Sequence, residues 1–511
     1  MILGGDFNTY LNPTLDKNGG KSELESNYAK QLKSVCKEFD LIDIWRLNNP
    51  KEKRFTWRDN TRAGFVQSRL DYFFISRHLN YLILKTLLKP GFRSDHSLIN
   101  IQIELLQTQK RGKGYWKFNN SLLYDKTYVS LVKEELKKLS GNQEIQDKSC
   151  FWDFVKCQIR TITISYCRSL AHQRRTKERF LLGKIEDLEK NFRSDSHEYN
   201  MLKKEWENLH QLKTEGAIMR SKVDWAEHGE KNTKFFLNLE KKNYNLKYIK
   251  KLIINDSVEL RKPAEILEEE KQFYKNLYTS KISGGPRAGD DFLSAENIPR
   301  LKDSDKKICD APLSLEEIAK ATKELKNDKS PGSDGLSTNF YKFFWPDIKL
   351  FLFDSYKDSF KNNLLSRDQR RGILNLIPKP NKDLCYLKNW RPVSILNTDY
   401  KILTKALSNR LQPILPEIVS SDQVGYIKDR QITENIRIIN DIMTYTELKH
   451  IPGFISLIDF EKAFDSVEWP FLLKTLEAFN FGNTFIRWIS ILYTKIQSCV
   501  SNNGYFQITL S

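Results

Sequence analysis

The sequence has little cysteine and no long apolar run, and both absences limit what kind of protein it can be. Seven cysteines are spread over 511 residues, and none belongs to a C-x-x-C pair or to a Cys/His cluster with zinc spacing. We therefore expect reduced thiols, as in an intracellular protein. No apolar run approaches the roughly 18 residues of a membrane span, and the N-terminus lacks a signal-peptide layout. These absences argue against a disulfide scaffold, a zinc domain and a membrane-spanning protein.

Negative charge is also comparatively scarce. The chain carries 83 Lys and Arg against 65 Asp and Glu, a net charge of +18, and most of this surplus lies between residues 110 and 251. Such an excess favours a polyanionic partner, and nucleic acid is the first candidate. With 40% hydrophobic and 12% aromatic residues the composition is that of a globular protein. The length allows roughly two to four domains with cores of their own.

The patterns of strand and helix change along the chain. Residues 1 to about 105 alternate short strands, turns and helices, with clear strands at 70–75 and 98–103. A basic, glycine-containing linker at 110–114 marks a domain boundary. Residues 115–250 are mostly helical in pattern, with apolar residues at a spacing of three or four. Those apolar residues include Phe180, Leu181, Ile185, Leu188 and Phe192.

Two further signals organise the second half. Residues 281–300 contain several glycines and prolines and predict a flexible loop. Ser314 and Glu317 have the capping-box spacing that opens a helix, which we expect to reach about Leu325. From there to the end, predicted helices alternate with a few strands.

The segment 454–469, FISLIDFEKAFDSVEW, is the most informative one. Its apolar start, Phe454–Ile458, predicts a strand that delivers Asp459, and an amphipathic helix is predicted from Val467 to Phe479. A carboxylate at the end of a buried strand is costly unless a cation compensates it, and phosphoryl transfer uses metal-bound carboxylates of this kind. The alternative is a strand followed by an N-capped helix, with Asp459 and Asp465 on the surface.

Three short blocks near the N-terminus form a second pattern. They are Gly4–Asn8 (GGDFN), Ser68–Tyr72 (SRLDY) and Ser94–Ser97 (SDHS). Each block alone is usually structural. In this order and within about 90 residues they resemble the C-terminal half of the endonuclease/exonuclease/phosphatase fold, a two-sheet sandwich that hydrolyses phosphodiesters with a divalent metal.

That resemblance implies a role for each polar residue of the blocks. His96 would exchange a proton beside the phosphate, and Asp71 would fix its tautomer. Asp6 would orient or deprotonate the attacking water, Asn8 would hold it and stabilise the pentacovalent phosphorus, and Asp95 would lie near the metal. The family takes further metal ligands, an Asn and a Glu, from strands ahead of GDFN. Because the sequence opens inside a predicted strand, we expect an incomplete and inactive nuclease half.

The C-terminal blocks resemble another family. In order they are Lys329–Gly335 (KSPGSDG), Leu376–Pro380 (LIPKP), Asn389–Ser394 (NWRPVS), Gln423–Arg430 (QVGYIKDR) and the segment 454–469. They are similar to the fingers and upper palm of reverse transcriptases of the LINE type, that is, of non-LTR retrotransposons. The block 220–242 resembles the stretch between nuclease and polymerase in such proteins, although a plain helical connector explains it equally well. Retroviral enzymes, telomerases and intron maturases carry no such nuclease ahead of the polymerase.

On this second resemblance Asp459 is a catalytic metal ligand and Phe464 takes the position that senses the ribose. Lys379 and Arg391 would meet the incoming triphosphate, although a structural salt bridge explains Arg391 equally well. Trp390 is expected in the core.

Six further cations are candidates for nucleic-acid contact. The helical pattern KILTKALSNRL presents Lys401, Lys405 and Arg410, which either touch template phosphates or form a solvated face. The basic run at 168–179 contains Arg174, Arg175 and Lys177, with the same two interpretations.

What the polymerase-like part lacks bears on its activity. Two-metal phosphoryl transfer needs a second set of carboxylates, and no Asp follows Asp465 in the sequence. The chain stops where the family's next motif, a Gln-Gly turn, is expected. In QVGYIKDR, Asp429 stands where the family commonly has Gly, which puts the local turn in doubt. We therefore expect a chain that binds nucleic acid and does not polymerise.

The sequence thus predicts an α+β multidomain protein. Its expected parts are a partial endonuclease/exonuclease/phosphatase sandwich at 1–108, a helical basic connector at 109–280, a flexible loop at 281–310 and a truncated right-hand polymerase, fingers and upper palm, at 311–511. The expected function is that of a fragment of a LINE-type second-reading-frame protein for target-primed reverse transcription, missing both ends. Its expected cofactor is Mg²⁺ or Mn²⁺, its partners are RNA template, target DNA and dNTP, and its location is the nucleus and cytoplasmic ribonucleoprotein. A non-catalytic nucleic-acid-binding relic is the alternative, and a helical adaptor with accidental motifs is a third.

Overall fold

The computed structural model describes most of the chain. Outside the described residues lie 21–25, 62–63, 105–111, 142–144, 192–195, 222–247, 255–257, 281–292, 294–297, 461 and 511. Of residues 212–221 and 508–510 only the backbone is described. Several predicted features therefore lie wholly or largely outside the described residues. They are the start of the linker predicted at 110–114, Phe192, nearly all of the block 220–242 and most of the loop predicted at 281–300.

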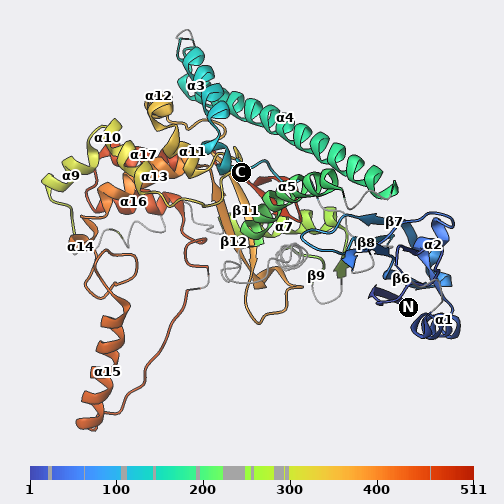
Figure 1. Cartoon of the computed structure of the whole chain (residues 1–511). Coiled ribbons are helices and arrows are strands. Elements are labelled where there is room, and N and C mark those ends of the chain that lie inside the picture. The colour runs from blue at the N-terminus through green and yellow to red at the C-terminus, as the bar shows by residue number, and fades with distance from the viewer. Residues whose placement is uncertain are drawn as a thin grey trace. The chain divides into compact units, whose positions relative to one another are not determined.

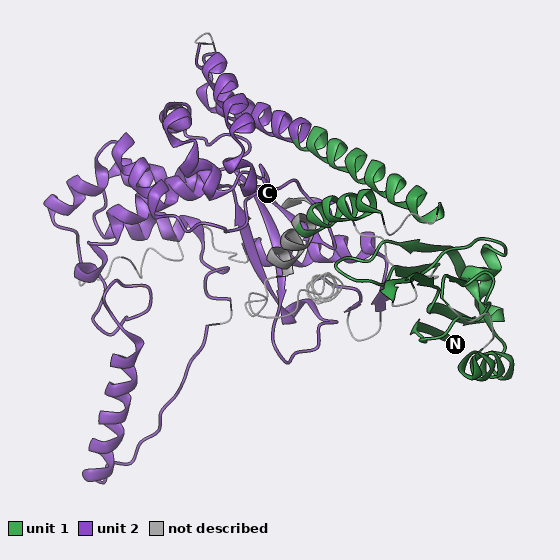
Figure 2. Cartoon of the chain, in the orientation of Figure 1, with its two compact units in different colours: residues 1–110, 167–246 green, residues 111–166, 247–511 purple. Residues whose placement is uncertain are grey.

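Two compact units make up the chain (Figure 2). Unit 1 comprises residues 1–110 and 167–246, and unit 2 comprises residues 111–166 and 247–511. The region expected as a single connector, 109–280, is therefore shared between the two units. Its longest helix, α4 (Lys148–Lys190), supplies residues to both of them.

Unit 1 contains short antiparallel sheets (Figure 1). The first sheet has the order β1-β6-β3, the second β2-β5-β4, and β7 pairs with β8. The strands are β1 (Ile2–Asp6), β2 (Lys17–Asn18), β3 (Leu41–Asp43), β4 (Trp57–Thr61), β5 (Gly64–Ser68), β6 (Asp71–Ser76), β7 (Ile83–Lys89) and β8 (Leu98–Ile103). The helices between them are α1 (Asn27–Glu38), α2 (Ile44–Asn48) and the 3₁₀ helix η1 (Arg77–Leu82). The strands predicted at 70–75 and 98–103 are confirmed as β6 and β8.

The core of the first sheet follows from alternation along β6. Tyr72 and Phe74 are each 1% exposed and lie on one face of that strand, where their rings stack with centroids 5.2 Å apart. Phe7 meets Phe74 edge-on at 5.2 Å, and Leu41 joins the same cluster. Aromatic pairs of this kind contribute about 0.5–1.5 kcal/mol beyond the area they bury. They hold the start of β6, where Asp71 stands, against the end of β1.

The second part of unit 1 is a pair of helices. The C-terminal part of α4 and α5 (His197–Ser221) pack through an apolar cluster of Leu181, Ile185, Leu188, Tyr199 and Trp206. The three-to-four spacing predicted for α4 is therefore confirmed at Leu181, Ile185 and Leu188. Phe180 is 60% exposed, because it lies at the edge of this apolar side of the helix.

Unit 2 is built on a sheet of order β12-β11-β13-β14. β11 (Arg371–Pro378) is antiparallel to β12 (Trp390–Leu396) and parallel to β13 (Gln497–Asn502), which pairs with β14 (Tyr505–Leu510). Helix α7 (Pro263–Tyr278) packs on the sheet, and its Tyr274 shares an apolar core with Leu374, Leu376, Trp390 and Val500. The expectation of a core position for Trp390 is confirmed.

Helices make up most of the remainder of unit 2. They are η2 (Asn120–Tyr124), α3 (Lys126–Ser140), α9 (Asp303–Asp310), α10 (Leu315–Glu324), α11 (Thr338–Phe343), α12 (Trp345–Asn362), η5 (Leu387–Asn389), α13 (Thr398–Leu411), α14 (Leu415–Ile418), α15 (Ile432–Leu448), α16 (Trp469–Ala478) and α17 (Asn483–Tyr493). A small hairpin, β9 (Leu252–Ile254) with β10 (Val258–Leu260), completes the unit. The capping box at Ser314 and Glu317 is confirmed, and the helix that it opens ends within one residue of the prediction. No described helix is long and apolar enough to cross a membrane.

The strand predicted at Phe454–Ile458 does not form. Residues 451–460 have neither helix nor strand and are all exposed, with Phe454 at 93% and Leu457 at 87%. An extended segment becomes a strand only when a neighbour satisfies its backbone groups, and this one has no paired strand in the described part of unit 2. α15 buries no residue either, and Figure 1 shows α15 and the chain after it standing apart from the other helices of the unit. The helix predicted at 467–479 is confirmed in a shorter form as α16.

Candidate functional sites

Asp6, Asp71 and His96 meet at one edge of unit 1. Asp6 ends β1 and lies directly opposite Asp71, the first residue of β6, in the antiparallel ladder. His96, just before β8, has its Nδ1 2.9 Å from an Asp71 carboxylate oxygen. One ligand atom from each residue lies within 4.8 Å of the other two. Three blocks spread over about 90 residues of the sequence therefore supply one cluster of polar side chains.

The other two residues expected at this site flank the cluster. The Asn8 backbone N–H donates to an Asp6 carboxylate oxygen at 2.9 Å, and Asn8 has a φ of 51°. Asn is one of the residues that tolerate this left-handed conformation best, which explains the tight turn after the strand. Asp95 accepts a hydrogen bond from the Trp57 indole N–H at 3.1 Å, and Trp57 forms a backbone bridge with His96.

The charges of this cluster favour a bound cation. Two carboxylates directly opposite each other on a ladder repel one another, although water screens the exposed Asp6 more than Asp71, whose side chain is 13% exposed. Carboxylate oxygens are the protein ligands that Mg²⁺ and Mn²⁺ prefer. Because His96 Nδ1 is engaged by Asp71, the ring orientation and the tautomer are fixed by this contact.

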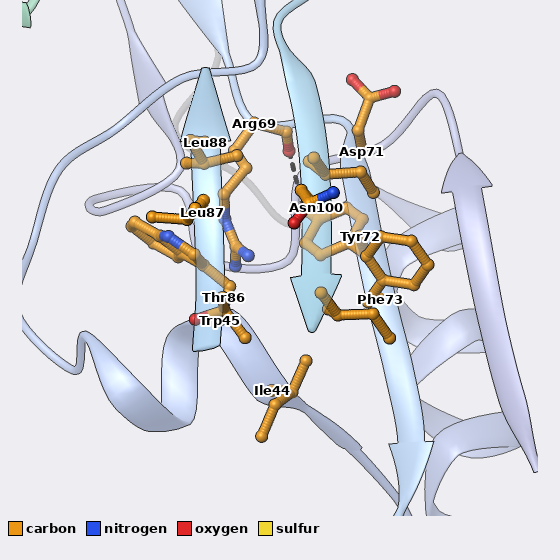
Figure 3. A pocket seen from close by; sticks show the side chains of 12 residues that line it. Ile44, Trp45, Arg69, Asp71, Tyr72, Phe73, Thr86, Leu87, Leu88 and Asn100 are labelled. Carbon is orange, nitrogen blue, oxygen red and sulfur yellow. Dashed lines mark hydrogen bonds between the residues drawn. The ribbon is translucent and has the colours of Figure 1, made fainter. Parts of the chain in front are cut away.

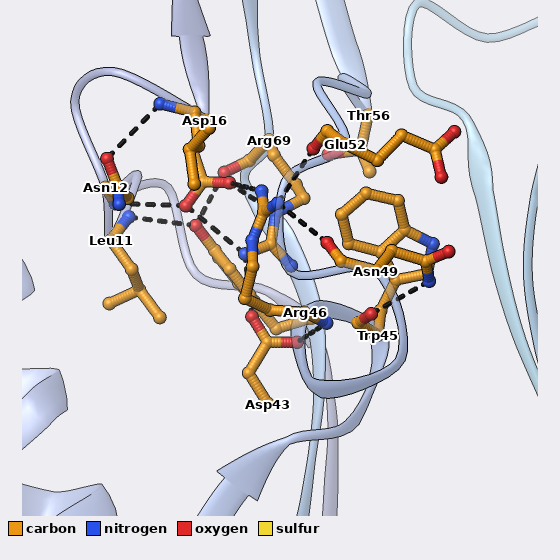
Figure 4. Close-up of polar contacts among 12 residues, drawn as sticks. Leu11, Asn12, Asp16, Asp43, Trp45, Arg46, Asn49, Glu52, Thr56 and Arg69 are labelled. Carbon is orange, nitrogen blue, oxygen red and sulfur yellow. Dashed lines mark hydrogen bonds and ion pairs between the residues drawn. The ribbon is translucent and has the colours of Figure 1, made fainter.

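Sequence reasoning missed the residue that supports the cluster, Arg69. Its guanidinium bonds Asp16 through Nε at 2.8 Å and Nη2 at 3.2 Å, and bonds Asp43 at 2.6 Å. Arg46 reaches the same Asp16 carboxylate at 2.5 Å, so two cations converge on it (Figure 4). Arg69 is 1% exposed and Asp16 is fully buried. Although burial opposes the charged form, the charges of Asp43 and Asp16 raise the pKa of Arg69 above its ordinary value.

The same network ties the loop after β1 to β6. The Tyr72 hydroxyl lies 2.7 Å from the Arg69 carbonyl, 3.1 Å from the Thr9 carbonyl and 3.1 Å from the Leu11 N–H. The Arg69 guanidinium also stacks over the Tyr72 ring at 4.4 Å. Arg69 lies inside the SRLDY block, so the only available signal was a cation two residues ahead of Asp71.

A cavity beside Asp71 belongs to the packing of the strands. It measures about 10 Å³, no more than a single water needs, and apolar residues of β6, β7, β8 and α2 form most of its lining. In Figure 3 the Asp71 carboxylate points away from these apolar side chains. The cavity is therefore too small for a ligand, and the chemistry of this region lies with the carboxylate.

In unit 2 the hairpin β11–β12 gathers the predicted nucleotide contacts. Arg391 lies opposite Ile377, and Lys379 continues the ladder through a 2.9 Å backbone bond to Asn389. Residues two apart on a strand, and residues directly opposite, share a face, so Lys379 and Arg391 lie on one face of the hairpin. Ile377 and Arg391 are exposed there, whereas Leu376 and Trp390 on the other face are buried. The Lys379 ammonium donates to the Lys388 carbonyl at 2.8 Å.

The three cations of α13 have different surroundings. Lys401 lies 3.4 Å from the Ser330 carbonyl of the KSPGSDG turn, and burial lowers its pKa. Lys405 pairs with Glu324 at 3.3 Å and lines a hollow of about 430 Å³ that Lys320 and Lys428 also line.

Arg410 differs from the expectation of a surface position. It is 5% exposed, and its guanidinium bonds both oxygens of Glu317 and the carbonyls of Cys309, Ala311 and Pro312. This geometry uses the fork of donors to join α13 to the start of α10. The structure therefore places Arg410 in the interior of unit 2, away from any surface that a template could reach.

Most of the described residues of the segment 454–469 are exposed. Asp459 is exposed within the unpaired stretch, and Phe464, 81% exposed, meets the Tyr426 ring edge-on at 5.8 Å. Asp465 accepts from the Tyr278 hydroxyl of α7 at 3.5 Å. Both Asp465 and Tyr278 line a hollow of about 550 Å³.

A buried charge network, which the sequence did not indicate, holds the KSPGSDG turn. The Lys156 ammonium of α4 is 2.9 Å from Asp399, 3.1 Å from Asp153 and 3.9 Å from both Asp334 and Asp368. Asp334 belongs to the turn, and burial raises its pKa to about 7. Burial alone would lower the pKa of Lys156, but Asp399 and its neighbours raise it above the ordinary value. The ammonium group of Lys156 thus brings together four carboxylates from different elements of unit 2.

The two glycines of that turn are required by close approach. A Cβ on Gly332 would lie 2.0 Å from the Asn397 side-chain oxygen, and one on Gly335 would lie 2.3 Å from the Trp116 ring. Gly335 also has a φ of +79°, which disfavours every other residue type.

The basic run of α4 lies on the surface of unit 1. Arg174, Arg175 and Lys177 are exposed, and Lys177 pairs with Glu205 of α5 at 2.6 Å. An exposed pair of this kind contributes little to stability.

The sequence of unit 2 matches the family "Reverse transcriptase (RNA-dependent DNA polymerase)" over residues 377–510, which includes Lys379, Arg391 and Asp459. The whole chain is similar to a 149 kDa protein of the transposon TX1 from Xenopus laevis, with 32% identity over 98% of this chain and 38% of that protein. This chain is a LINE-type protein with a reverse-transcriptase domain.

Two other relatives are similar over a shorter stretch of the LINE-type chain. The first is a Pol polyprotein of the type-1 retrotransposable element R1 from Bradysia coprophila, which is 26% identical over 38% of this chain and 19% of that protein. The second is an RNA-directed DNA polymerase of the mobile element jockey from Drosophila funebris, which is 26% identical over 32% of this chain and 18% of that protein. The chain spans less than two-fifths of the length of each of these three relatives.

Proposed function

We propose that the chain is part of a protein for target-primed reverse transcription, in which unit 1 acts on DNA phosphodiesters and unit 2 handles RNA template and dNTP. The observation that supports the first half is the cluster of Asp6, Asp71 and His96, with ligand atoms within 4.8 Å. The reverse-transcriptase match to residues 377–510 supports the second.

At the cluster, the carboxylates of Asp6 and Asp71 would hold Mg²⁺ or Mn²⁺, with Asp95 nearby and His96 beside them. When bound, the metal neutralises charge that develops on a phosphate. Asp71 keeps the His96 Nδ1 proton and orients the ring, which leaves Nε2 to exchange a proton with the substrate or water. Asp6 accepts a proton from the attacking water, and Asn8, directed by its turn, holds that water.

In unit 2 the exposed face of the β11–β12 hairpin would meet the triphosphate through Lys379 and Arg391, Phe464 would lie near the ribose, and Asp459 would hold metal. Lys401 and Lys405 would contact template phosphates, as would Arg174 and Arg175 in unit 1. A protein with these substrates acts in the nucleus and in a cytoplasmic ribonucleoprotein.

We further propose that this chain by itself binds metal and nucleic acid without turnover. Two carboxylates are few ligands for a metal that takes about six, and the described residues place no second carboxylate set beside Asp459. On this view the chain behaves as a non-catalytic nucleic-acid binder.

The deciding experiment measures metal and DNA together. Mn²⁺ is titrated into the full chain and into Asp71→Asn, and supercoiled plasmid is incubated with Mg²⁺ and either His96→Ala or the unchanged chain. We expect one Mn²⁺ site that Asp71→Asn weakens at least tenfold, and no nicking. Nicking that His96→Ala abolishes would show that the chain is an active nuclease, and the absence of a Mn²⁺ site would overturn the metal-dependent function.

Binding by unit 2 is tested with a labelled RNA. Affinity that falls steeply with salt supports phosphate contacts, because they release counterions. Template-dependent incorporation of dNTP, abolished by Asp459→Ala, would contradict the absence of turnover.

A further inference from the structure

The residues 91–97, here called the His96 loop, join β7 to β8 and carry Asp95 and His96. Within the loop, the His96 backbone N–H donates to the Ser94 hydroxyl at 3.0 Å. A Cβ on Gly91 would lie 1.7 Å from the His96 carbonyl oxygen, so the chain folds back on itself there. A surface loop depends on contacts with neighbouring elements to keep one position, and the proposed site needs His96 in one place.

Helix α5 supplies a polar stripe that holds the loop from outside. Lys203 donates from Nζ to the Ser94 carbonyl at 2.8 Å. Glu207 accepts from the Arg93 backbone N–H at 2.9 Å, and Gln211 accepts from the Arg93 guanidinium at 2.8 Å. Each of these three residues is four positions from the next, so they lie on one face of the helix and contact successive parts of the loop.

Apolar contact reinforces the stripe. Phe92 of the loop packs against the cluster that joins α4 and α5, which includes Leu181, Ile185 and Trp206. Phe92 is partly buried in this contact, and removing apolar surface from water is favourable. The loop is therefore held by the hydrophobic effect as well as by hydrogen bonds.

Helix α4 contacts β4 and the residues just before that strand, which lie next to the loop. Its Glu189, 4% exposed, bonds Arg54 at 3.0 Å and Arg58 at 3.1 Å. Arg58 also donates to the Ser97 hydroxyl at 2.9 Å, which extends the contact to the last residue of the loop. A buried carboxylate with two arginine partners is strongly fixed, because loss of either partner leaves a charge uncompensated.

We propose that the hairpin of α4 and α5 positions the His96 loop, with Lys203 and Glu207 as positioning residues for the metal cluster of unit 1. The helices between the two functional parts are then a component of the nuclease-like site. That the helices hold the loop is independent of the proposed function. That this contact affects metal binding rests on the proposed function.

Hydrogen exchange of the full chain tests the first step. Lys203→Met and Glu207→Met remove one loop contact each, Lys203→Arg retains the donor, and Lys204→Met changes an exposed neighbour on the same helix. In the two contact variants we expect the amides of 91–97 to exchange about tenfold faster, while the β6 amides keep their rate and so report an intact fold. Equal exchange rates in Lys203→Met, Glu207→Met and Lys204→Met would overturn the positioning role.

Mn²⁺ affinity tests the second step and separates two explanations. Removal of a lysine charge near the carboxylates would by itself strengthen Mn²⁺ binding. Loss of positioning weakens it, typically by about tenfold when an orienting partner is lost. We expect weaker binding in Lys203→Met, recovered in Lys203→Arg. Faster loop exchange with unchanged or stronger Mn²⁺ binding would refute Lys203 as a positioning residue. Faster loop exchange in a chain that has no Mn²⁺ site at all would overturn the metal function, while the conclusion that α5 holds the loop would stand.

Discussion

Asp6 and Asp71 lie directly opposite each other at the end of the β1–β6 ladder, and His96 contacts the second of them at 2.9 Å. Two like charges at adjacent ladder positions destabilise the sheet. A bound cation would offset this repulsion, and the metal site proposed for unit 1 rests on that argument.

Asp6→Asn should separate the repulsion between the two carboxylates from their contribution to metal binding. Without metal we expect unit 1 to become more stable by roughly 0.2–1 kcal/mol, because one of two facing charges is removed. With Mn²⁺ we expect the variant to lose the stabilisation that the metal gives the unchanged chain. Thermal unfolding with and without Mn²⁺ measures both, and Asp40→Asn, an exposed carboxylate paired with Arg77, is the control.

Arg69→Met should destabilise unit 1 strongly. The change leaves the buried Asp16 and the nearby Asp43 without their shared cation, and loss of one member of a buried ion pair costs about 3–5 kcal/mol. Urea unfolding gives the free energy. Arg77→Met, whose pair with Asp40 is exposed, should cost less than about 1 kcal/mol. Similar losses in the two variants would argue against the network as the support of β6.

Lys156→Met should have the corresponding effect in unit 2. Four carboxylates would lose their common partner, with an expected cost of about 3–5 kcal/mol, and the amides of the KSPGSDG turn should exchange faster. Lys133→Met on the exposed side of α3 is the matched control. If the turn keeps its exchange rate in Lys156→Met, the network does not position it.

Glu270→Gln should remove a pH dependence of stability. Glu270 is fully buried, neither of its carboxylate oxygens has a hydrogen-bond partner, and burial raises its pKa to about 8. Because the folded-state pKa exceeds the unfolded value, its contribution is fully present below about pH 4.5 and is lost as pH rises through 8. At pH 9 we expect the variant to be more stable than the unchanged chain by a few kcal/mol, since one pKa unit corresponds to about 1.4 kcal/mol.

Urea unfolding between pH 5 and pH 9 measures this slope. Glu316→Gln, an exposed carboxyl on α10, should leave the slope unchanged. A slope that persists undiminished in Glu270→Gln would assign the pH dependence to other groups, of which Asp334, with its pKa raised to about 7, is the first candidate.

Asp429 tests the turn in which the sequence departs from its family. Its φ of 65° is the left-handed conformation that glycine adopts without cost. Asp429→Gly should therefore change the stability by no more than about 0.5 kcal/mol, since relief of strain offsets the greater freedom of the unfolded chain. Asp429→Val should cost about 1–2 kcal/mol, because a β-branched residue is disfavoured there. Equal effects of the two substitutions, measured by urea unfolding, would contradict this account.

Local patterns predicted the elements that depend on local contacts. The capping box at Ser314 and Glu317, the strand at 98–103 and the apolar side of α4 at Leu181, Ile185 and Leu188 were all legible, because capping and periodicity act over a few residues. The strand predicted at Phe454–Ile458 failed for the opposite reason. Its five apolar residues fit a strand, but a strand also needs a neighbour, which no local pattern supplies.

The sequence by itself determined the family and named the candidate residues, since the order and residue types of blocks such as LIPKP and NWRPVS, or GGDFN, SRLDY and SDHS, are visible without a structure. Only the tertiary structure decided which residues meet and which support them. Asp6, Asp71 and His96 converge through strand register, Arg410 turns inward onto Glu317, and Lys203 reaches the His96 loop across more than 100 residues. Contacts between residues far apart in sequence depend on how whole elements pack, and the free energy of that packing has no signature in any single segment.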